Sequence, residues 1–355
     1  MKFGPVRPAD ALGAIAVHSI REGAFVLKKG TVLGPDEVRA LEAAGIKEVV
    51  VARLEEGDVP EDMAAGELAK AVAGEGVHVE RAFTGRANLF AESAGVLVVD
   101  ERAIDELNAV DPAITLATLP AFAPVVPGKM IATVKIIPFS VPGETCERAL
   151  KTLRSSAPPV RVAPYKIRKV GVISTMLPGL APKVIEKTLR VLAERLKPAG
   201  AEIIGERKVA HDSGALAPAI EEMLQAGAEL VIVFGASAIA DERDVIPAAV
   251  TNIGGRIEHF GMPVDPGNLL LVAEARGRPV LGAPGCARSP KENGFDWVLM
   301  RLLAGLPVRR RDITAMGVGG LLMEIVTRPQ PREPQPSLSH RIAALVLAAG
   351  RSTRM

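Results

Sequence analysis

The sequence predicts an α/β protein whose largest part is a three-layer, doubly wound and mostly parallel sheet, with smaller α+β regions before it. Between residues 160 and 308, apolar strand-like runs alternate with helical periodicity in the order strand, helix, strand, helix, strand. Right-handed crossovers then place the strands in one Rossmann-like sheet with helices on its faces. The run AELVIVFGASA (228–238) is almost continuously apolar, which is typical of a parallel strand covered on both faces.

The part before residue 160 divides into two smaller regions, 1–54 and 55–159. In the first, a helix is expected to begin at Pro35-Asp36 and to stop at Gly45, followed by the β-branched strand KEVVVA. In the second, GVLVVDERAIDELNAV predicts a strand and then a helix, and KMIATVKIIPF predicts a further strand. Both regions are therefore expected to be small α+β units.

The third region, 160–327, gives the clearest pattern. Its expected strands are RKVGVIST, AEIIGERKV and the run that ends at Phe234, and its expected helices are 180–196 and 213–227. A Pro-rich stretch at 328–340 has no core-forming pattern and is expected to be an extended linker, which leaves 341–355 as a separate segment.

Composition excludes several classes of function. Aromatic residues make up 3% of the chain, which counts against base stacking on aromatic platforms, and the formal net charge is +2. The start of the chain lacks a signal peptide, and no run of about 20 apolar residues is present. Two cysteines are too few for a disulfide framework. We therefore expect a cytoplasmic protein with no nucleic-acid or membrane partner.

The loop after Phe234 is the first candidate ligand site. In an open α/β sheet, ligands bind beyond the carboxyl ends of the strands, where small residues let a backbone approach a phosphate. Asp244 lies before a predicted helix and either holds Mg²⁺ against a phosphate or caps that helix. The candidate cofactor-binding residues of this loop are Gly235, Ala236, Ser237, Ala238 and Asp241.

Three further loops are expected at the same edge. Asp212 follows a predicted strand and is either a catalytic carboxylate or a helix cap, while His211 is interpreted as a surface histidine. Cys286 is either an inert loop cysteine or a contact to a sulfur- or metal-bearing ligand. Arg288 is expected to grip a phosphate as a fork, and Lys291 to act as a point charge. The other candidates are Pro263, Pro266, Gly267, Asn268, Gly285 and Ser289.

These loops resemble those of the molybdopterin-binding domain that molybdopterin adenylyltransferases, molybdopterin molybdotransferases and competence-damage proteins share. The stretch 235–238 is similar to their Gly-Gly-Thr-Gly or Gly-Gly-Val-Ser loop, and Asp212 and Asp244 match their acidic residues. The stretches 262–267 and 282–287 are similar to a Lys-Pro-Gly-Lys-Pro segment and a Gly-Leu-Pro-Gly-Asn-Pro loop. The resemblance implies molybdopterin or molybdenum cofactor as ligand, Mg²⁺, and a dimer or trimer.

The sequence also departs from that pattern. One loop glycine is replaced by Ala236, the two lysines fall at Met262 and Asp265, and Cys286 stands in place of an asparagine. These changes are compatible with binding of the phosphate and the pterin. They count against adenylyl transfer or metal insertion by this domain.

The last residues carry a second resemblance. LAAGRSTRM is similar to the Leu-x-Ala-Ala-Gly-x-Ser-x-Arg-Met signature of nucleotidyltransferases, including molybdenum cofactor cytidylyltransferases. The resemblance implies that the chain stops inside the first motif of such an enzyme and lacks its activity. The nucleotide-binding residues carried over from it are Ala348, Ala349, Gly350 and Arg354.

Together the resemblances imply a binding module of molybdenum cofactor biosynthesis. It would hold a phosphorylated pterin and present it to a fused or partner nucleotidyltransferase. One alternative is an active molybdotransferase or adenylyltransferase that uses Mg²⁺ with Asp212 and Asp244. Another is a scaffold domain that keeps the fold without the ligand.

Overall fold

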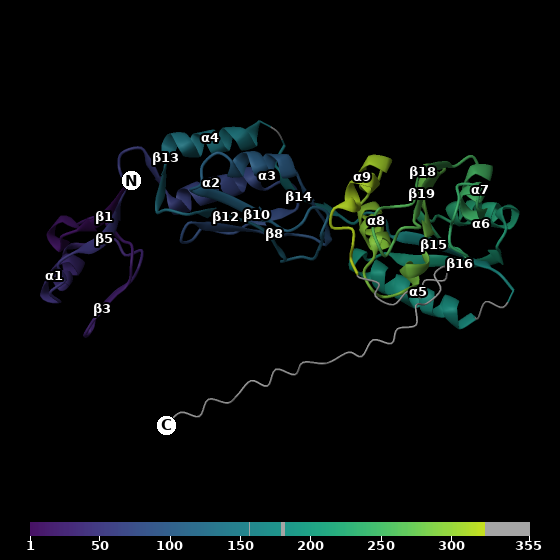
Figure 1. Cartoon of the computed structure of the whole chain (residues 1–355), viewed down its shortest axis with the longest axis horizontal. Coiled ribbons are helices and arrows are strands. Elements are labelled where there is room, and N and C mark those ends of the chain that lie inside the picture. Colours follow the sequence, from purple (N-terminus) through teal and green to yellow (C-terminus); the bar gives the residue numbers. More distant parts are fainter. Residues whose placement is uncertain (156, 179–181, 324–355) are drawn as a thin grey trace, which may run out of the picture. The chain divides into compact units, whose positions relative to one another are not determined.

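The computed structural model describes residues 1–155, 157–178 and 182–323 (Figure 1). The expected linker at 328–340 and the nucleotidyltransferase-like segment at 341–355, with Ala348, Ala349, Gly350 and Arg354, lie outside the described residues. None of the helices within the described ranges is long and apolar enough to cross a membrane.

The first region is a small sheet with one helix packed on it. Its three-stranded sheet has the order β1-β5-β2, and β5 (Val49–Arg53) overlaps the stretch 47–52 where the sequence predicts a strand. The expected helix is α1 (Pro35–Ala43), and the chain turns at Gly45 with a φ of +71°. The remaining elements are β1 (Lys2–Val6), η1 (Pro8–Asp10), β2 (Ile15–Ala16), β3 (Ile20–Glu22) and β4 (Phe25–Leu27).

The second region packs three helices against antiparallel strands. The predicted strand and helix are β9 (Gly95–Val99) and α3 (Glu101–Asn108), and KMIATVKIIPF forms β12 (Met130–Ile136). The other strands are β6 (Asp58–Pro60), β7 (Val77–Val79), β8 (Arg86–Ala91), β10 (Ile114–Thr118), β11 (Pro124–Val125) and β13 (Ser140–Pro142). The strand β14 (Val160–Pro164) pairs with β9 and so belongs to this sheet, although residue 160 was expected to open the third region. The helices that the sequence did not indicate are α2 (Glu61–Val72) and α4 (Gly143–Arg154).

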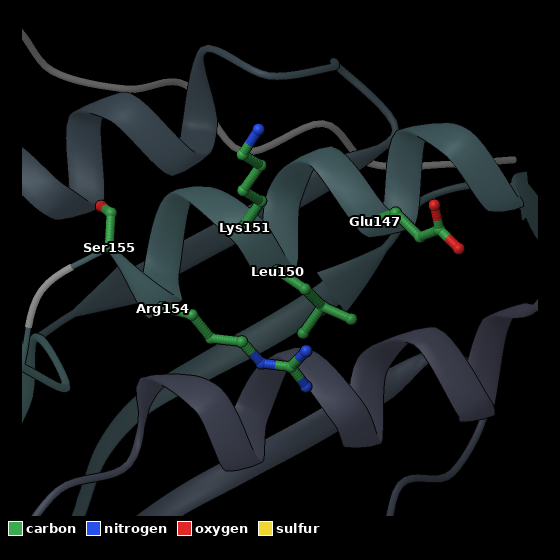
Figure 2. A pocket seen from close by; sticks show the side chains of 5 residues that line it. All are labelled: Glu147, Leu150, Lys151, Arg154 and Ser155. Atoms are coloured by element: carbon green, nitrogen blue, oxygen red, sulfur yellow. The ribbon is translucent and has the colours of Figure 1, made fainter.

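The sheets of this region have the orders β10-β12-β8-β7 and β11-β9-β14, and β13 pairs with β6. Figure 1 shows α2, α3 and α4 together on one side of β8, β10 and β12, and one apolar core joins them. A shallow hollow lies on α4 and is lined by side chains of Glu147, Leu150, Lys151, Arg154 and Ser155 (Figure 2). Leu150 and Arg154 point to the opposite side from Lys151.

The third region has the mostly parallel sheet that the sequence predicts. Its six strands have the order β16-β15-β17-β20-β19-β18, and β15, β16, β17 and β20 run parallel. The strand β19 runs against both neighbours, so that β18 again points the same way as the other four. The strands are β15 (Lys169–Met176), β16 (Glu202–Ala210), β17 (Leu230–Phe234), β18 (Arg256–Phe260), β19 (Leu271–Ala275) and β20 (Arg278–Ala283).

Helices cover both faces of this sheet and complete three layers. On one face, Leu192 of α5 and Phe295 of α8 share a core with Val172 and Ile232. On the other face, α6 and α7 pack on the side chains of the same strands that point the other way, and Figure 1 shows these two helices side by side. The helices are α5 (Pro182–Leu196), η2 (Lys197–Ala199), α6 (Ser213–Gln225), α7 (Val245–Asn252), η3 (Gly285–Arg288), α8 (Gly294–Leu303), α9 (Arg310–Thr314) and η4 (Ala315–Gly317).

Candidate functional site

The loops that follow β15, β16, β17, β18 and β20 all leave the sheet at its carboxyl edge. The strand β17 ends at Phe234, as the sequence predicts, and its apolar residues are buried because helices cover both faces. At that point the chain leaves the core, so the next side chains reach the surface. This edge is therefore where the predicted site residues are expected to gather.

A chain of hydrogen bonds joins three of these loops. The Oγ1 atom of Thr175, at the end of β15, lies 2.8 Å from Nδ1 of His211, which follows β16. The other ring nitrogen of His211, Nε2, lies 2.8 Å from Oγ of Ser237 in the loop after β17. The backbone amide of Ala236 donates to the same Thr175 oxygen at 2.8 Å. His211 therefore lies in a loop, as expected, but it is half-buried and links three strand ends, which its sequence did not indicate.

Arg288 ties the loop after β20 to the loop after β17. Its Nη2 donates to the carbonyl oxygen of Gly235 at 2.9 Å, and its Nη1 donates to Oγ1 of Thr188 on α5 at 3.0 Å. The guanidinium lies over the ring of Phe234, 5.2 Å from its centroid. Burial lowers the pKa of Arg288. Two of the Arg288 nitrogens that were expected to contact a phosphate therefore donate to other residues of the protein.

Arg195 of α5 fastens the rest of the loop after β20, a role that the sequence analysis missed. Its guanidinium donates to the carbonyl oxygens of Ala287 at 2.8 Å and Ser289 at 2.6 Å. It also pairs with the carboxylate of Asp296 on α8. The Arg195 side chain is only 9% exposed, so these bonds are shielded from water and fix the loop firmly. Nothing local to Arg195 signals partners that are about a hundred residues away.

The acidic candidates serve as helix caps. Asp212 accepts from the amide of Ala215 at 2.9 Å and begins α6. Asp244 begins α7, and its two oxygens accept from the amides of Val245 at 2.7 Å and Ala240 at 3.1 Å. Each of these bonds satisfies a backbone donor that the helix or loop leaves open. The cap interpretation is thus confirmed for both residues, while a further role toward a ligand stays a prediction.

Asp241, unlike Asp212 and Asp244, does not cap a helix but forms an ion pair with Arg243. It accepts from both the side chain and the backbone amide of Arg243, at 2.7 and 2.9 Å. The Arg243 side chain is the main cause that lowers the pKa of Asp241 to about 2. Within the described ranges, no cluster of three or more His, Cys, Asp or Glu side chains is arranged to hold a metal ion. The described carboxylates therefore do not gather into a site for Mg²⁺, and no step is assigned to the metal.

The loop after β18 lies at the same edge but faces the start of α8. Gly267 has a φ of +142°, and a Cβ there would come within 2.8 Å of the Gly294 nitrogen. The carbonyl oxygen of Pro266 accepts from that same nitrogen at 2.8 Å. Asn268 donates back to the carbonyl oxygen of Met262 at 3.3 Å, and Pro263 is exposed. Within the described part of the chain, none of these residues is hydrogen-bonded to Ser237 or His211.

The remaining candidates lie on the loop after β20. Burial raises the pKa of the Cys286 thiol, so that this side chain stays a neutral thiol at pH 7. Its carbonyl oxygen accepts from the buried Asn293, which also caps α8. Gly285 and Lys291 are exposed, and Ser289 accepts from the Lys291 amide at 3.3 Å. A protonated, half-buried thiol favours the inert interpretation of Cys286.

The loop 235–238 has the form of an anion site. A Cβ on Gly235 would lie 2.6 Å from the carbonyl oxygen of Ser237, so the tight turn requires glycine there. Ser237 and Ala238 are exposed, and their amides have no hydrogen-bond partner among the described residues. Consecutive open amides beside a hydroxyl group are a common arrangement for binding an anion.

Comparison with known proteins points to this same domain. Residues 171–315 match the model of the family described as "Probable molybdopterin binding domain". Residues 5–53 match a domain of unknown function. None of the curated proteins is similar enough in sequence to be matched to the chain.

Solved structures give the following likenesses. A molybdopterin biosynthesis MoeA protein from Pyrococcus horikosii is 14% identical, with a TM-score of 0.31, over 86% of this chain and 75% of that one. A molybdenum cofactor biosynthesis protein B is 15% identical, with a TM-score of 0.30, over 39% and 95%. A tungsten cofactor synthesizing protein MoaB from Pyrococcus furiosus is 17% identical, with a TM-score of 0.27, over 39% and 92%.

The family match covers the six-stranded sheet from β15 to β20 and the helices α5 to α8. All the loops of the carboxyl edge lie within its limits, from Thr175 to Lys291. The chain therefore contains, at residues 171–315, a domain similar to the probable molybdopterin binding family.

Proposed function

We propose that the carboxyl edge of the third region binds molybdopterin or molybdenum cofactor through the terminal phosphate. The observation that carries this proposal is the loop 235–238, where two open amides lie beside the exposed Ser237 hydroxyl. Donors fixed in advance bind an anion without the entropic cost of ordering them on binding. The similarity of residues 171–315 to the probable molybdopterin binding family supports a pterin as the rest of the ligand.

The contacts below the loop explain why it would keep its shape without ligand. Thr175 holds the Ala236 amide, and Arg288 holds the Gly235 carbonyl, so both sides of the turn are fastened to the sheet and to α5. The side chain of Lys291 is exposed on the neighbouring loop, where it supplies positive charge. The positive charge of Arg288, which is bonded to the Gly235 carbonyl, would also attract the phosphate without a direct contact.

We further propose that the bound cofactor is presented to a nucleotidyltransferase. The resemblance of Leu345–Met355 to a nucleotidyltransferase signature supports this role. A tethered or associated enzyme would meet the cofactor at an effective concentration in the millimolar range, on the order set by a short flexible linker. Binding by residues 171–315 would then raise the rate of transfer without new chemistry in this domain.

Native mass spectrometry of the purified chain tests the first proposal. A co-purified mass equal to molybdopterin or its metal-loaded form supports it. Affinity for added molybdopterin is then compared between the wild type, Ser237→Ala and Ser155→Ala. Loss of one hydrogen bond to a charged group should weaken binding by roughly 10- to 100-fold in Ser237→Ala. Ser155 is exposed directly after the end of α4, in the hollow of Figure 2, and its replacement should leave affinity unchanged. Equal affinities in all three proteins would contradict the assignment.

The alternative, a transferase that uses Mg²⁺, makes a different prediction for Asp244→Asn. Asparagine caps a helix about as well as aspartate, so α7 should be retained, although its single amide oxygen can no longer accept from both Val245 and Ala240. A cofactor-binding module keeps its affinity for molybdopterin in this variant. A Mg²⁺-dependent transferase loses turnover, which an assay of molybdate insertion or adenylyl transfer with the isolated chain would detect.

A further inference from the structure

The side chains of Thr175, His211 and Ser237 come from three strand ends and are joined by two hydrogen bonds. The number of hydrogens that they carry fixes the direction of both bonds. Thr175 is completely buried, His211 is half-buried, and Ser237 is exposed. The two distances from the His211 ring nitrogens to the hydroxyl oxygens are both 2.8 Å. Which atom donates in each bond follows from counting the hydrogens that each group can offer.

The count begins at Thr175, which has one hydroxyl hydrogen. Its Oγ1 already accepts the Ala236 amide, and a buried hydroxyl needs an acceptor for its own hydrogen. Among the described residues, the acceptor within reach is Nδ1 of His211. That nitrogen must then be unprotonated. The neutral ring carries its single hydrogen on Nε2, which donates to Ser237 Oγ.

We propose that His211 is a positioning residue that makes Ser237 a hydrogen-bond donor toward the ligand. Because Ser237 Oγ accepts from His211, its own hydrogen is directed away from the ring and into the open space at the edge of the sheet. The group it suits is an oxygen that only accepts, such as a phosphate oxygen. The proposal rests on the proposed function for the identity of the ligand, although the proton arrangement belongs to the protein alone.

The same three residues resemble a nucleophile with its base, and the proton count separates the two arrangements. A base must accept the serine proton at Nε2, so that nitrogen would have to be bare and Nδ1 protonated. A protonated Nδ1 would face the Thr175 hydroxyl, whose hydrogen would then lack an acceptor among the described residues. Ser237 is thus a ligand-binding hydroxyl and is not activated for attack.

Nitrogen-15 NMR of the wild-type chain at pH 7 tests the proton arrangement directly. The His211 signals are assigned by their absence from the His211→Gln variant. We expect the nitrogen-15 chemical shift of Nδ1 to be that of an unprotonated ring nitrogen, and the shift of Nε2 to be that of a protonated one. In a separate test, a fluorophosphonate should not label Ser237. A protonated Nδ1, or stoichiometric labelling, would overturn the proposal.

Variants test whether the proton relay matters for binding. Thr175→Val removes the hydroxyl and should leave a mixture of His211 tautomers, whereas Thr175→Ser should keep the wild-type spectrum. The glutamine nitrogen of His211→Gln can take the place of Nε2, so affinity for molybdopterin should stay within about threefold. His211→Asn does not reach Ser237 and should bind about tenfold more weakly. Equal affinity in the two His211 variants would count against positioning by His211.

The two proposals fail in different ways. If the wild type shows the expected tautomer but does not bind molybdopterin, the ligand is wrong and the proton arrangement stands. If molybdopterin binds while His211 carries its proton on Nδ1, the ligand stands and the positioning role is wrong.

Discussion

The guanidinium of Arg288 donates to the carbonyl oxygen of Gly235, so that a hydrogen bond joins the loop after β20 to the loop after β17. The same side chain reaches Thr188 on α5 and lies over the ring of Phe234. One arginine therefore joins two loops and a helix at the carboxyl edge of the sheet. This relationship makes the candidate site a property of the folded edge rather than of any single loop.

Replacing Arg288 by lysine should test that support. The point charge of a lysine does not reproduce two donors in a fixed plane, so both bonds cannot be made at once. We expect the free energy of unfolding to fall by about 1 to 2 kcal/mol, measured by urea denaturation followed by circular dichroism. Arg39→Lys is the matched control, because Arg39 is exposed and, among the described residues, forms an ion pair with Asp36 on the same helix and no other. A control that loses as much stability as the test variant would argue against the special role of Arg288.

Gly235→Ala should disturb the loop itself. The new Cβ would lie 2.6 Å from the Ser237 carbonyl oxygen and 3.3 Å from Cδ1 of Ile246, so backbone must move. A destabilisation of about 1 to 3 kcal/mol is expected in thermal unfolding, together with weaker molybdopterin binding. Gly66→Ala is the control, because Gly66 lies inside α2 and has room for a side chain. Its new Cβ would lie 3.8 Å from Cβ of Ala82, which is an ordinary contact distance. There we expect a gain of about 0.5 to 1 kcal/mol. Similar effects in both variants would show that loop geometry is not the cause.

The pH dependence of the loop can be followed at Asp241. Hydrogen bonds from Arg243 lower the pKa of this carboxyl from its ordinary 3.8 to about 2. The contact is therefore fully present above pH 3.8 and is lost as the pH falls through about 2. Carbon-13 NMR of the carboxyl should show this late titration in the wild type. In Arg243→Gln the midpoint should rise toward 3.8, and a wild-type midpoint already near that value would refute the pairing.

The chain contains one tyrosine, which makes its ionisation easy to observe. Tyr165 is 4% exposed, and burial raises its pKa from 10 to about 12. A raised pKa in the folded state stabilises the protein below pH 10, and this contribution is lost as the pH rises through about 12. Absorbance at 295 nm should therefore stay low in the native protein at pH 10 to 11 and rise near 12 or on unfolding. Half ionisation of the native chain at pH 10 would show that Tyr165 keeps the ordinary pKa of 10 and is accessible to water.

Much of the third region could be predicted because its signals are local. The end of β17 at Phe234 follows from a run of apolar residues that stops at a glycine. The starts of α6 and α7 follow from Asp212 and Asp244, since short acidic side chains cap helices through neighbouring amides. The division of the chain at residues 54, 159 and 327 rests on weaker composition signals and stays a prediction.

The contacts that shape the site could not be predicted in the same way. His211 was interpreted as a surface loop histidine because no second His or Cys accompanies it at metal-ligand spacing, and its actual partners are not its neighbours in sequence. Thr175 lies 36 residues before it, and Ser237 lies 26 residues after it. Arg195 likewise fastens a loop that follows it by 92 to 96 residues. Such contacts depend on the order of strands in the sheet, which the spacing of residues along the chain does not reveal.

The reversed direction of β19 has a consequence for how this protein can vary. Because β19 runs against β18 and β20, the chain enters and leaves the 261–270 stretch at the same edge of the sheet as the 235–238 loop. A longer or differently shaped connection there would change this edge of the sheet without breaking the pairing of β15 with β16 and β17. The 261–270 stretch can therefore vary while the hydrogen bonds that join Thr175, His211 and Ser237 stay in place.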